Sequence, residues 1–269
     1  MPSPVRPRSA WGRLDPTTAP AEGPVAFGGD LSPRSLLDAY RQGLYPFPAT
    51  TIEHRLLNEL TYESDVAAGR IALRTSGRDP YGIAWCSPDP RPVISVARAH
   101  LQRSLRRQLR GVDWTTTVDV CFERVAAQCR EGRSEHWLTD ELLASLTRLH
   151  ECGYAHSVEV WDGGELIGGV FGMRIGAVFS ADSQFTLRSG AGKAAVAELT
   201  RRFGEVGGVA VDVQRDSDHA RLLGARPVPR ARYLELLRTP HRPTPLRTGR
   251  RPVRLLTDRR GTDDGPATD

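Results

Sequence analysis

The sequence predicts a mixed α/β protein whose central sheet is mostly antiparallel. Three alternating or apolar segments, separated by glycine-containing turns, indicate an antiparallel meander. They cover residues 155–161, 165–175 and 177–182. A glycine-bearing loop that ends at Lys193 then leads into a predicted helix over 194–206 and a buried strand over 209–213. Strands followed by such a loop, a helix and another strand are typical of a mixed α/β domain.

A small N-terminal domain is predicted over residues 1–88. Ser32 is a good N-cap and Pro33 suits the first helical position, so a helix is expected from there to Gly43. Residues 49–80 are polar and carry mixed signals, and we interpret them as an insertion. This domain therefore combines one clear helix with a segment of undefined structure.

A second domain is predicted over residues 89–237. Before the meander, its strands and helices are expected over residues 92–96, 99–110, 113–117, 118–130 and 140–152. The remaining residues, 238–269, are rich in Arg and Pro and poor in apolar side chains. A segment of that composition buries too little apolar surface to fold, so we expect a disordered tail.

Composition and charge narrow the class of protein. The formal net charge of +5 and the pI of about 9.3 favour an anionic partner. No apolar run reaches the ~18 residues that span a membrane, and the start lacks a signal-peptide pattern, so we expect a cytoplasmic protein without membrane contact. The four cysteines form no C-x-x-C pair and no metal motif is present, so reduced thiols and no metal are expected.

Four arginines share one face of the helix predicted over 99–110, because they are spaced at i, i+3, i+4 and i+7. They are Arg103, Arg106, Arg107 and Arg110. Guanidinium groups placed in this way repel one another unless an anion meets them, and phosphate is the natural anion for Arg. RNA contact is therefore one interpretation. The other is a solvated face in a sequence whose 37 basic residues include a single lysine, Lys193.

The loop before the helix predicted at 194 matches phosphate-binding loops only in part. Gly190 and Gly192 precede Lys193 at a helix start, where backbone N–H groups can hold phosphate. Leu187 replaces the first glycine of the P-loop pattern, and Ala194 replaces its Ser or Thr. Leu187 also breaks the loop pattern of acetyl-CoA enzymes. We therefore exclude an NTPase and interpret the glycines as a turn.

Asp212 and Gln214 are candidate catalytic residues, because they lie two positions apart on an otherwise apolar predicted strand and should share a face. A carboxylate and an amide there are costly unless they are used or paired, although a polar strand end is the simpler alternative. Asp182 is expected beside them across the sheet. Phe47 and Trp137 could stack on nucleobases, although each aromatic residue taken alone is more typical of a core position.

Several ordered phrases resemble the bacterial leucyl/phenylalanyl-tRNA–protein transferase family. The resemblance runs from about Phe27 to Leu237, apart from residues 49–80. The phrases are Gly28-Gly-Asp-Leu-Ser-Pro33, Ala39-Tyr-Arg-Gln-Gly43, Trp85-Cys-Ser-Pro-Asp-Pro-Arg91, Trp137-Leu-Thr139, Leu149-His-Glu-Cys-Gly153, Ala155-His-Ser-Val-Glu-Val-Trp161, Leu166-Ile-Gly-Gly169, Asp212-Val-Gln214 and Leu223-Gly-Ala-Arg-Pro-Val-Pro-Arg230. No single phrase is specific, but the ordered set is.

The resemblance implies an acetyltransferase-like (GNAT) domain over 89–237 that binds tRNA instead of acetyl-CoA. It implies transfer of Leu or Phe, and less well Met, from aminoacyl-tRNA to proteins with an N-terminal Arg or Lys. The product would be a degradation signal, and neither metal nor cofactor would be required. We expect a monomeric enzyme.

The family's Asp and Gln fall on Asp212 and Gln214, and its Glu becomes Asp182. By this resemblance Asp212 would orient the attacking amine and accept its proton. Gln214 would hold Asp212 or the reacting carbonyl, and Asp182 would help to bind the cationic acceptor. The shorter side chain of Asp182 draws its carboxylate back by one methylene.

The family's substrate-contacting residues also differ here. Its two tryptophans that stack on the 3′ end of tRNA fall on Phe47 and Trp137, and its pocket methionine falls on Val170. Its Ser-Lys pair becomes Gly192 and Lys193, which joins the arginine face as a candidate tRNA contact. Two rival functions stay open: an acetyl-CoA-dependent N-acetyltransferase, and a catalytically inactive tRNA-binding homologue.

Overall fold

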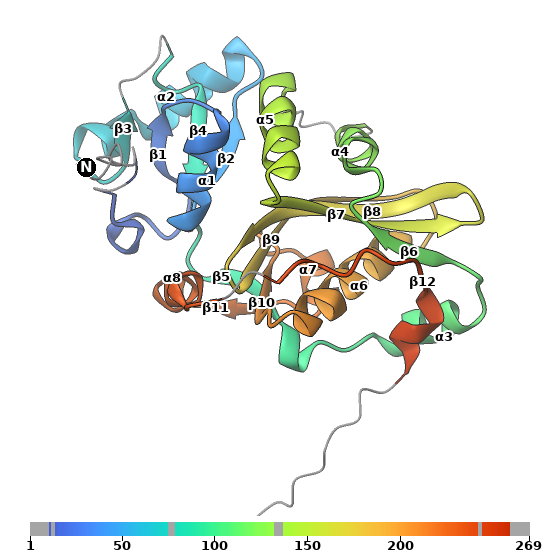
Figure 1. The fold of residues 1–269 in the computed structure, drawn as a ribbon. Helices are drawn as coiled ribbons and strands as arrows, with labels where there is room; N and C mark the ends of the chain where they lie inside the picture. Colours follow the sequence, from blue (N-terminus) through green and yellow to red (C-terminus); the bar gives the residue numbers. More distant parts are fainter. Residues whose placement is uncertain (1–10, 12–13, 75–78, 132–136, 242–243, 259–269) are drawn as a thin grey trace, which may run out of the picture.

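The chain forms a small sheet and a large sheet that lie side by side (Figure 1). The structure is a computed structural model, and it describes residues 11, 14–74, 79–131, 137–241 and 244–258. The small sheet has four strands in the order β2-β4-β1-β3. Their bounds are β1 Pro24–Gly28, β2 Tyr45–Pro48, β3 Ala72–Arg74 and β4 Ile83–Cys86.

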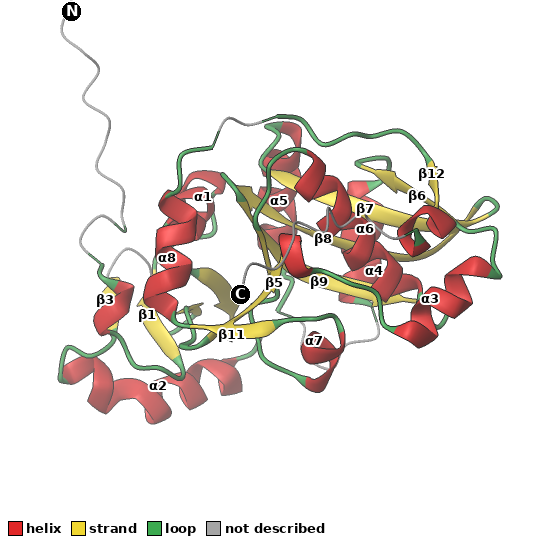
Figure 2. Cartoon of the chain, turned by 90° about the horizontal axis from the view of Figure 1, so that it is seen from below, coloured by secondary structure: helices red, strands yellow, loops and turns green. Residues whose placement is uncertain are grey.

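Two helices belong to the small sheet. Helix α1 spans Pro33–Arg41, and the Ser32 hydroxyl accepts a hydrogen bond from the backbone N–H of Ser35 at 3.3 Å, which confirms the predicted N-cap. The segment interpreted as an insertion contains helix α2, Ile52–Ala67, together with strand β3. Helix α2 has no buried residue and runs along the outer edge of the molecule (Figure 2).

The large sheet has eight strands in the order β11-β5-β10-β9-β8-β7-β6-β12. Among its described pairs, all are antiparallel except β9 with β10, so the prediction of a mixed, mostly antiparallel sheet is confirmed. The bounds are β5 Arg91–Ser95, β6 Thr115–Val118, β7 Ala155–Asp162, β8 Glu165–Ile175, β9 Val178–Thr186, β10 Ala210–Asp212, β11 Arg226–Val228 and β12 Arg251–Pro252.

Helices cover both faces of the large sheet. Figure 1 shows α4 and α5 on one face and α6 on the other. Helix α6 approaches β8 closely, because a Cβ on Gly168 would lie 2.7 Å from the Cβ of Ala191. The bounds are α3 Arg103–Arg110, α4 Phe122–Arg130, α5 Asp140–Glu151, α6 Ala191–Glu205, α7 Asp218–Leu222 and α8 Arg230–Arg238, with short 3-10 helices at Pro16–Thr18, Val96–Arg98 and Val253–Thr257.

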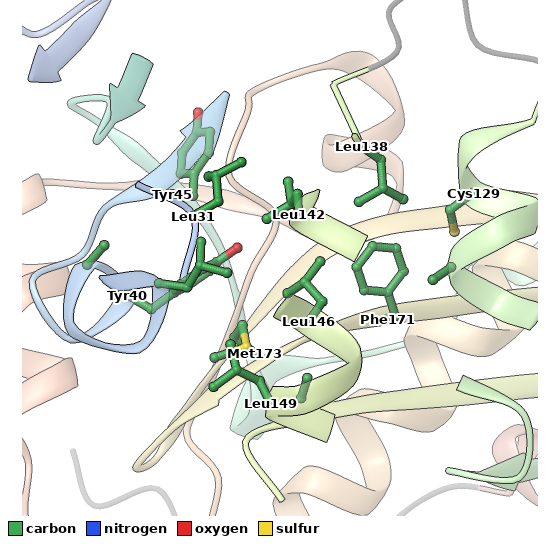
Figure 3. Packing of buried hydrophobic residues seen from close by; sticks show 14 of the residues in the cluster. Leu31, Tyr40, Tyr45, Cys129, Leu138, Leu142, Leu146, Leu149, Phe171 and Met173 are labelled. Atoms are coloured by element: carbon green, nitrogen blue, oxygen red, sulfur yellow. The ribbon is translucent and has the colours of Figure 1, made fainter. Parts of the chain in front are cut away.

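A single apolar cluster joins the two sheets. Leu142 and Leu146 of α5 pack with Phe171 of β8, and the same cluster includes Leu31 and Tyr40 from the small-sheet region (Figure 3). Burying side chains of this size stabilises the folded state by roughly 1.5–3 kcal/mol each. The small-sheet region is thus anchored to the large sheet, which fixes the position of the site between them.

The prediction of a disordered tail from 238 is wrong for the described residues 238–241 and 244–258. Strand β12 pairs with β6, and Leu246 and Val253 are buried in the core that contains α6. Arg202 of α6 is fully buried and donates to the backbone carbonyl of Gly249 at 2.8 Å. A few apolar residues spread among Arg and Pro are therefore sufficient to dock this segment. The remainder of the predicted tail lies outside the described residues.

Candidate active site

A pocket of about 540 Å³ lies where β9 and β10 separate beyond their parallel pairing, next to β2 and α7. One part of its wall is apolar, and the other carries a carboxylate, amides and a histidine. The residues that line it are Tyr45, Pro46, Phe47, Trp137, Val170, Ala181, Asp182, Ser183, Gln184, Val196, Val213, Gln214, Arg215, Ser217, His219, Ala220 and Leu223.

Asp182 brings a carboxylate to the pocket from a bulged part of β9, where the register against β8 shifts. Its Oδ2 accepts a hydrogen bond from the Tyr40 hydroxyl at 2.7 Å. Its Oδ1 accepts from the Ser180 hydroxyl at 2.9 Å and from Gln214 Nε2 at 2.7 Å. The predicted proximity of Asp182 and Gln214 across the sheet is confirmed.

The surroundings of Asp182 favour its neutral form. Burial raises the pKa of this carboxyl group to about 7, and the hydrogen bonds from Tyr40 and Ser180 offset part of that rise. Burial, followed by the charge of Asp182, raises the pKa of the Tyr40 hydroxyl well above its usual range, so Tyr40 stays a donor. A carboxyl group that titrates near neutral pH can exchange a proton with an amine.

Gln214 reaches Asp182 because the chain leaves the strand before it. Strand β10 ends at Asp212, and Gln214 has a φ of 63°, in the left-handed region that side-chain-bearing residues seldom adopt. The expectation that Asp212 and Gln214 share one face of a strand is therefore wrong. The backbone N–H of Gln214 donates to Asp212 Oδ1 at 2.8 Å, while its side-chain amide points to Asp182.

Asp212 lies behind the pocket, outside its lining. It is fully buried, and each of its oxygens accepts two hydrogen bonds. Arg91 Nε and the backbone of Gln214 donate to Oδ1, and Arg91 Nη2 and the Tyr233 hydroxyl donate to Oδ2 at 2.7 and 2.9 Å. Every acceptor position of the Asp212 carboxylate is thus occupied by a donor of the protein itself.

Arg91 is held from three sides. Besides its paired hydrogen bonds to Asp212, its guanidinium lies 4.8 Å from the ring centroid of Tyr45 and 4.7 Å from that of Tyr233. Burial acts to lower the pKa of Arg91, but Asp212, Tyr233 and Tyr45 together outweigh burial and raise it. Because Tyr45 also lines the pocket, Arg91 and Asp212 connect the small sheet, β10 and α8 behind the site.

Aromatic side chains line the outer part of the pocket. The rings of Phe47 and Trp137 are nearly parallel, with 13° between their planes and 6.5 Å between their centroids. Both residues are among the predicted stacking residues, but the sequence did not indicate that their rings would lie parallel to each other. Val170, on β8, is buried in the same apolar cluster as Val196 and Ala220, and all three line the pocket.

The arginine face lies on α3, at the other end of the large sheet (Figure 1). Arg103, Arg107 and Arg110 are exposed, whereas Arg106 is half-buried and lines a second pocket together with Lys193. The opposite face of α3 is buried through Leu105 and Leu109, as the spacing predicts. None of these basic side chains lines the first pocket.

Several residues of the site carried no role in the sequence reasoning. Tyr40 and Tyr233 bind the two carboxylates, and Arg91 balances the charge of Asp212. Arg91 closes the phrase Trp85-Cys-Ser-Pro-Asp-Pro-Arg91, but its buried partner lies 121 positions away. His219, another lining residue, contacts the Gln184 amide. No local sequence pattern identifies a tyrosine that contacts a carboxylate only in the folded protein.

The described residues contain no group of three or more His, Cys, Asp or Glu side chains placed to hold a metal ion. Within the same residues, no helix has both the length and the apolar character to cross a bilayer.

The fold and the pocket define an α/β protein whose sheet opens between two parallel strands around a cleft lined by apolar and polar side chains. A model of the family described as leucyl/phenylalanyl-tRNA protein transferase matches residues 93–238. The leucyl/phenylalanyl-tRNA–protein transferase of Thiobacillus denitrificans is 36% identical over 230 residues, which cover 83% of this chain and 88% of that protein. The protein of the same name from Oleidesulfovibrio alaskensis is 37% identical over 259 residues, covering 90% and 92%. The chain belongs to this family.

One solved structure to which the chain is similar is a GCN5-related N-acetyltransferase from Kribbella flavida. The identity is 17% and the TM-score is 0.35, with 52% of this chain and 54% of that chain covered.

Proposed function

We propose that the protein transfers Leu or Phe, and less well Met, from aminoacyl-tRNA to the N-terminal Arg or Lys of acceptor proteins. The added residue would mark the acceptor for degradation through its new N-terminus. The amine nitrogen attacks the ester carbonyl carbon, the bond to the ribose oxygen breaks, and that oxygen takes up the proton that the amine releases. Family membership supports this reaction, which needs no redox step.

The observation that carries the proposal is that one pocket is lined both by a cluster of apolar side chains and by a buried carboxylate with its hydrogen-bond donors. Val170 and Val196 offer an apolar wall to the transferred side chain, while Asp182 supplies the carboxylate. The parallel rings of Phe47 and Trp137 offer stacking surfaces for the terminal adenine. A site of this form can hold an aminoacyl ester between a nucleobase and a carboxylate.

Asp182 is the residue to which we assign contact with the acceptor amine. Its raised pKa of about 7 lies close to the ~8 of an α-amine, so proton exchange between the two groups is nearly balanced. The ionised carboxylate would bind the α-ammonium group and then accept its proton. Positioning an amine against an activated ester can supply roughly 7–11 kcal/mol of the barrier, in addition to the help of the carboxylate as a base.

Asp212 and Gln214 become positioning residues in this mechanism. Asp212 fixes the turn at Gln214 by accepting its backbone N–H, and the Gln214 amide then orients Asp182. Arg91 holds the buried Asp212 carboxylate in place through paired hydrogen bonds. On the tRNA side, Arg103, Arg107 and Arg110 present exposed charges to phosphates.

A transfer assay distinguishes this function from its two rivals. Purified protein is incubated with radiolabelled Leu-tRNA, Phe-tRNA or acetyl-CoA and a peptide that begins with Arg. Label from the two aminoacyl-tRNAs should appear in the peptide, and label from acetyl-CoA should not. Acetyl transfer would establish the N-acetyltransferase, and tRNA binding without any transfer would establish an inactive homologue.

A further inference from the structure

Helix α2 exposes a row of large apolar side chains that the proposed transfer does not use. Ile52, Leu56 and Leu60 are spaced at i, i+4 and i+8, so they lie along one side of the helix, and Leu57 adjoins them. Each of these four residues, which we call the α2 stripe, is 52–80% exposed. Grouped aliphatic side chains on a protein surface mark a place where another molecule binds.

The opposite side of α2 already has its partners within the chain. The side-chain amide of Asn58 donates to the backbone carbonyl of Tyr81 at 3.1 Å. The ring of Tyr62 lies 5.6 Å from that of Phe27, and Val66 packs against the same small cluster. These contacts anchor α2 to the small sheet and leave the α2 stripe exposed at the outer edge of the molecule, where the helix runs in Figure 2.

The surface around the α2 stripe is acidic, although the protein is basic overall. Helix α2 contains Glu53, Glu59, Glu63 and Asp65 against Arg55, a formal charge of −3 with histidine counted as neutral, whereas the whole chain carries +5. The three glutamates are exposed. Their charge disfavours RNA and anionic lipid, and docking of a second α2 would bring like charges together. A partner that is both apolar and basic is complementary to this surface.

The α2 stripe begins close to the first pocket. Phe47 lines that pocket, and Ile52 follows it by five positions, so their Cα atoms lie at most about 18 Å apart. From Ile52 to Leu60 the helix rises about 12 Å. An extended chain spans about 3.3–3.6 Å per residue, so a segment that starts in the first pocket reaches Leu60 after roughly nine residues.

We propose that the α2 stripe binds the segment of the acceptor protein that follows its N-terminal residue. The bound segment carries both apolar and basic side chains. Its apolar side chains cover Leu56 and Leu60, and its basic ones meet Glu59 and Glu63. This inference rests on the proposed function, since it takes the acceptor N-terminus to lie in the first pocket. It places part of the selection of acceptors on α2, outside that pocket.

Acceptor peptides of different length and charge test the α2 stripe. Transfer from Phe-tRNA is measured to a tripeptide that begins with Arg and to three peptides of roughly twelve residues with the same start, since that length reaches Leu60. The three continue with Lys and Leu, with Glu and Leu, or with Ser and Gly. In the unaltered protein, kcat/KM should be at least about tenfold higher for the Lys/Leu peptide than for the other acceptors. In Leu56→Ser, Leu60→Ser, this advantage should disappear through a rise in KM, while transfer to the tripeptide stays unchanged.

The double variant Val120→Ser, Leu187→Ser is the matched control, because these residues are 58% and 59% exposed and lie outside α2. It should keep the full advantage. No advantage in the unaltered protein, or one that survives in Leu56→Ser, Leu60→Ser, would overturn the docking site and leave the proposed function intact. Sedimentation that shows a dimer held by the α2 stripe would overturn it in favour of a second copy. Absence of transfer to every acceptor, the tripeptide included, would reject the proposed function itself.

Discussion

At the level of single residues, the two aspartates of the site differ in what surrounds them. Asp212 is fully buried with a paired arginine, and Asp182 lies against the pocket with hydroxyl and amide donors. Their sequence contexts do not reveal this difference, because both follow short apolar strands. The proximity of Asp182 and Gln214 was predictable from strand pairing, whereas the saturation of Asp212 depends on Arg91 and Tyr233, which lie far apart in the chain.

The substitution Asp212→Asn should destabilise the protein strongly. It leaves the buried Arg91 guanidinium without its opposite charge, and breaking a buried ion pair from one side costs about 3–5 kcal/mol. The free energy of unfolding, measured by urea titration, should fall by that amount. Asp38→Asn, which removes the half-buried partner of the exposed Arg41, should change it by less than about 1 kcal/mol. Equal effects of the two substitutions would refute the structural role of Asp212.

The substitution Asp182→Asn should remove one step of the pH profile. Below its raised pKa of about 7, the Asp182 carboxyl is protonated and cannot accept a proton, so transfer by the unaltered protein should rise as the pH passes about 7. In the variant this rise should disappear. Near pH 8 the single-turnover rate should be lower by roughly 10²–10⁴-fold.

The pH dependence of the Asp182→Asn variant differs from that of the unaltered protein in two testable ways. The difference between their single-turnover rates should become smaller at acid pH, because neither protein then has an ionised carboxylate at position 182. The difference in rate should become smaller again well above the amine pKa of ~8, where the amine is neutral and needs no carboxylate to accept its proton. Asp216→Asn, an exposed carboxylate that pairs with Arg221, is the control and should keep the original profile. If the pH–rate profile of Asp182→Asn is the same as that of the unaltered protein, Asp182 is not the base, and the tRNA becomes the candidate for that role.

At the level of elements, the periodicity of the sequence was sufficient for the central meander. Strands β7 and β8 and helix α5 begin and end within one residue of their predicted bounds, because turns and caps mark them. Strand β9 continues four residues past the predicted end at 182, and the first two of these, Ser183 and Gln184, line the pocket. Helix α8 was missed, because its nine residues carry three arginines and follow a proline-rich phrase.

Helix α3 carries a prediction of its own. Replacing Arg103 and Arg107 by Glu should weaken tRNA binding and lower the slope of log affinity against log salt by about 1 for each lost phosphate contact. Filter binding at several salt concentrations measures both quantities. Replacing Arg41 and Arg148, which lie on α1 and α5, makes the same charge change elsewhere and should leave the slope unchanged. Identical slopes for both double variants would exclude α3 as a tRNA contact.

For the whole molecule, the C-terminal segment is part of the folded structure. Deleting residues 240–269 removes the burial of Leu246 and Val253, each worth roughly 1.5–3 kcal/mol, and exposes the Arg202–Glu198 pair. The midpoint of thermal unfolding should therefore fall clearly. Deleting only 259–269 removes none of these contacts and should leave the midpoint in place. A protein lacking 240–269 that unfolds at the original midpoint would contradict this assignment.

The buried pair of Arg91 and Asp212 also sets an order of events during synthesis. The two residues are 121 positions apart, and at ribosomal rates roughly 6–24 s separate their appearance. Strand β5 finds its partners β10 and β11 only after that interval, and the Tyr233 hydroxyl emerges later still. Until then Arg91 has no buried counter-charge to pair with. The residues of the central meander therefore leave the ribosome before Asp212 and Gln214, and a product terminated after β9 lacks both of these site residues.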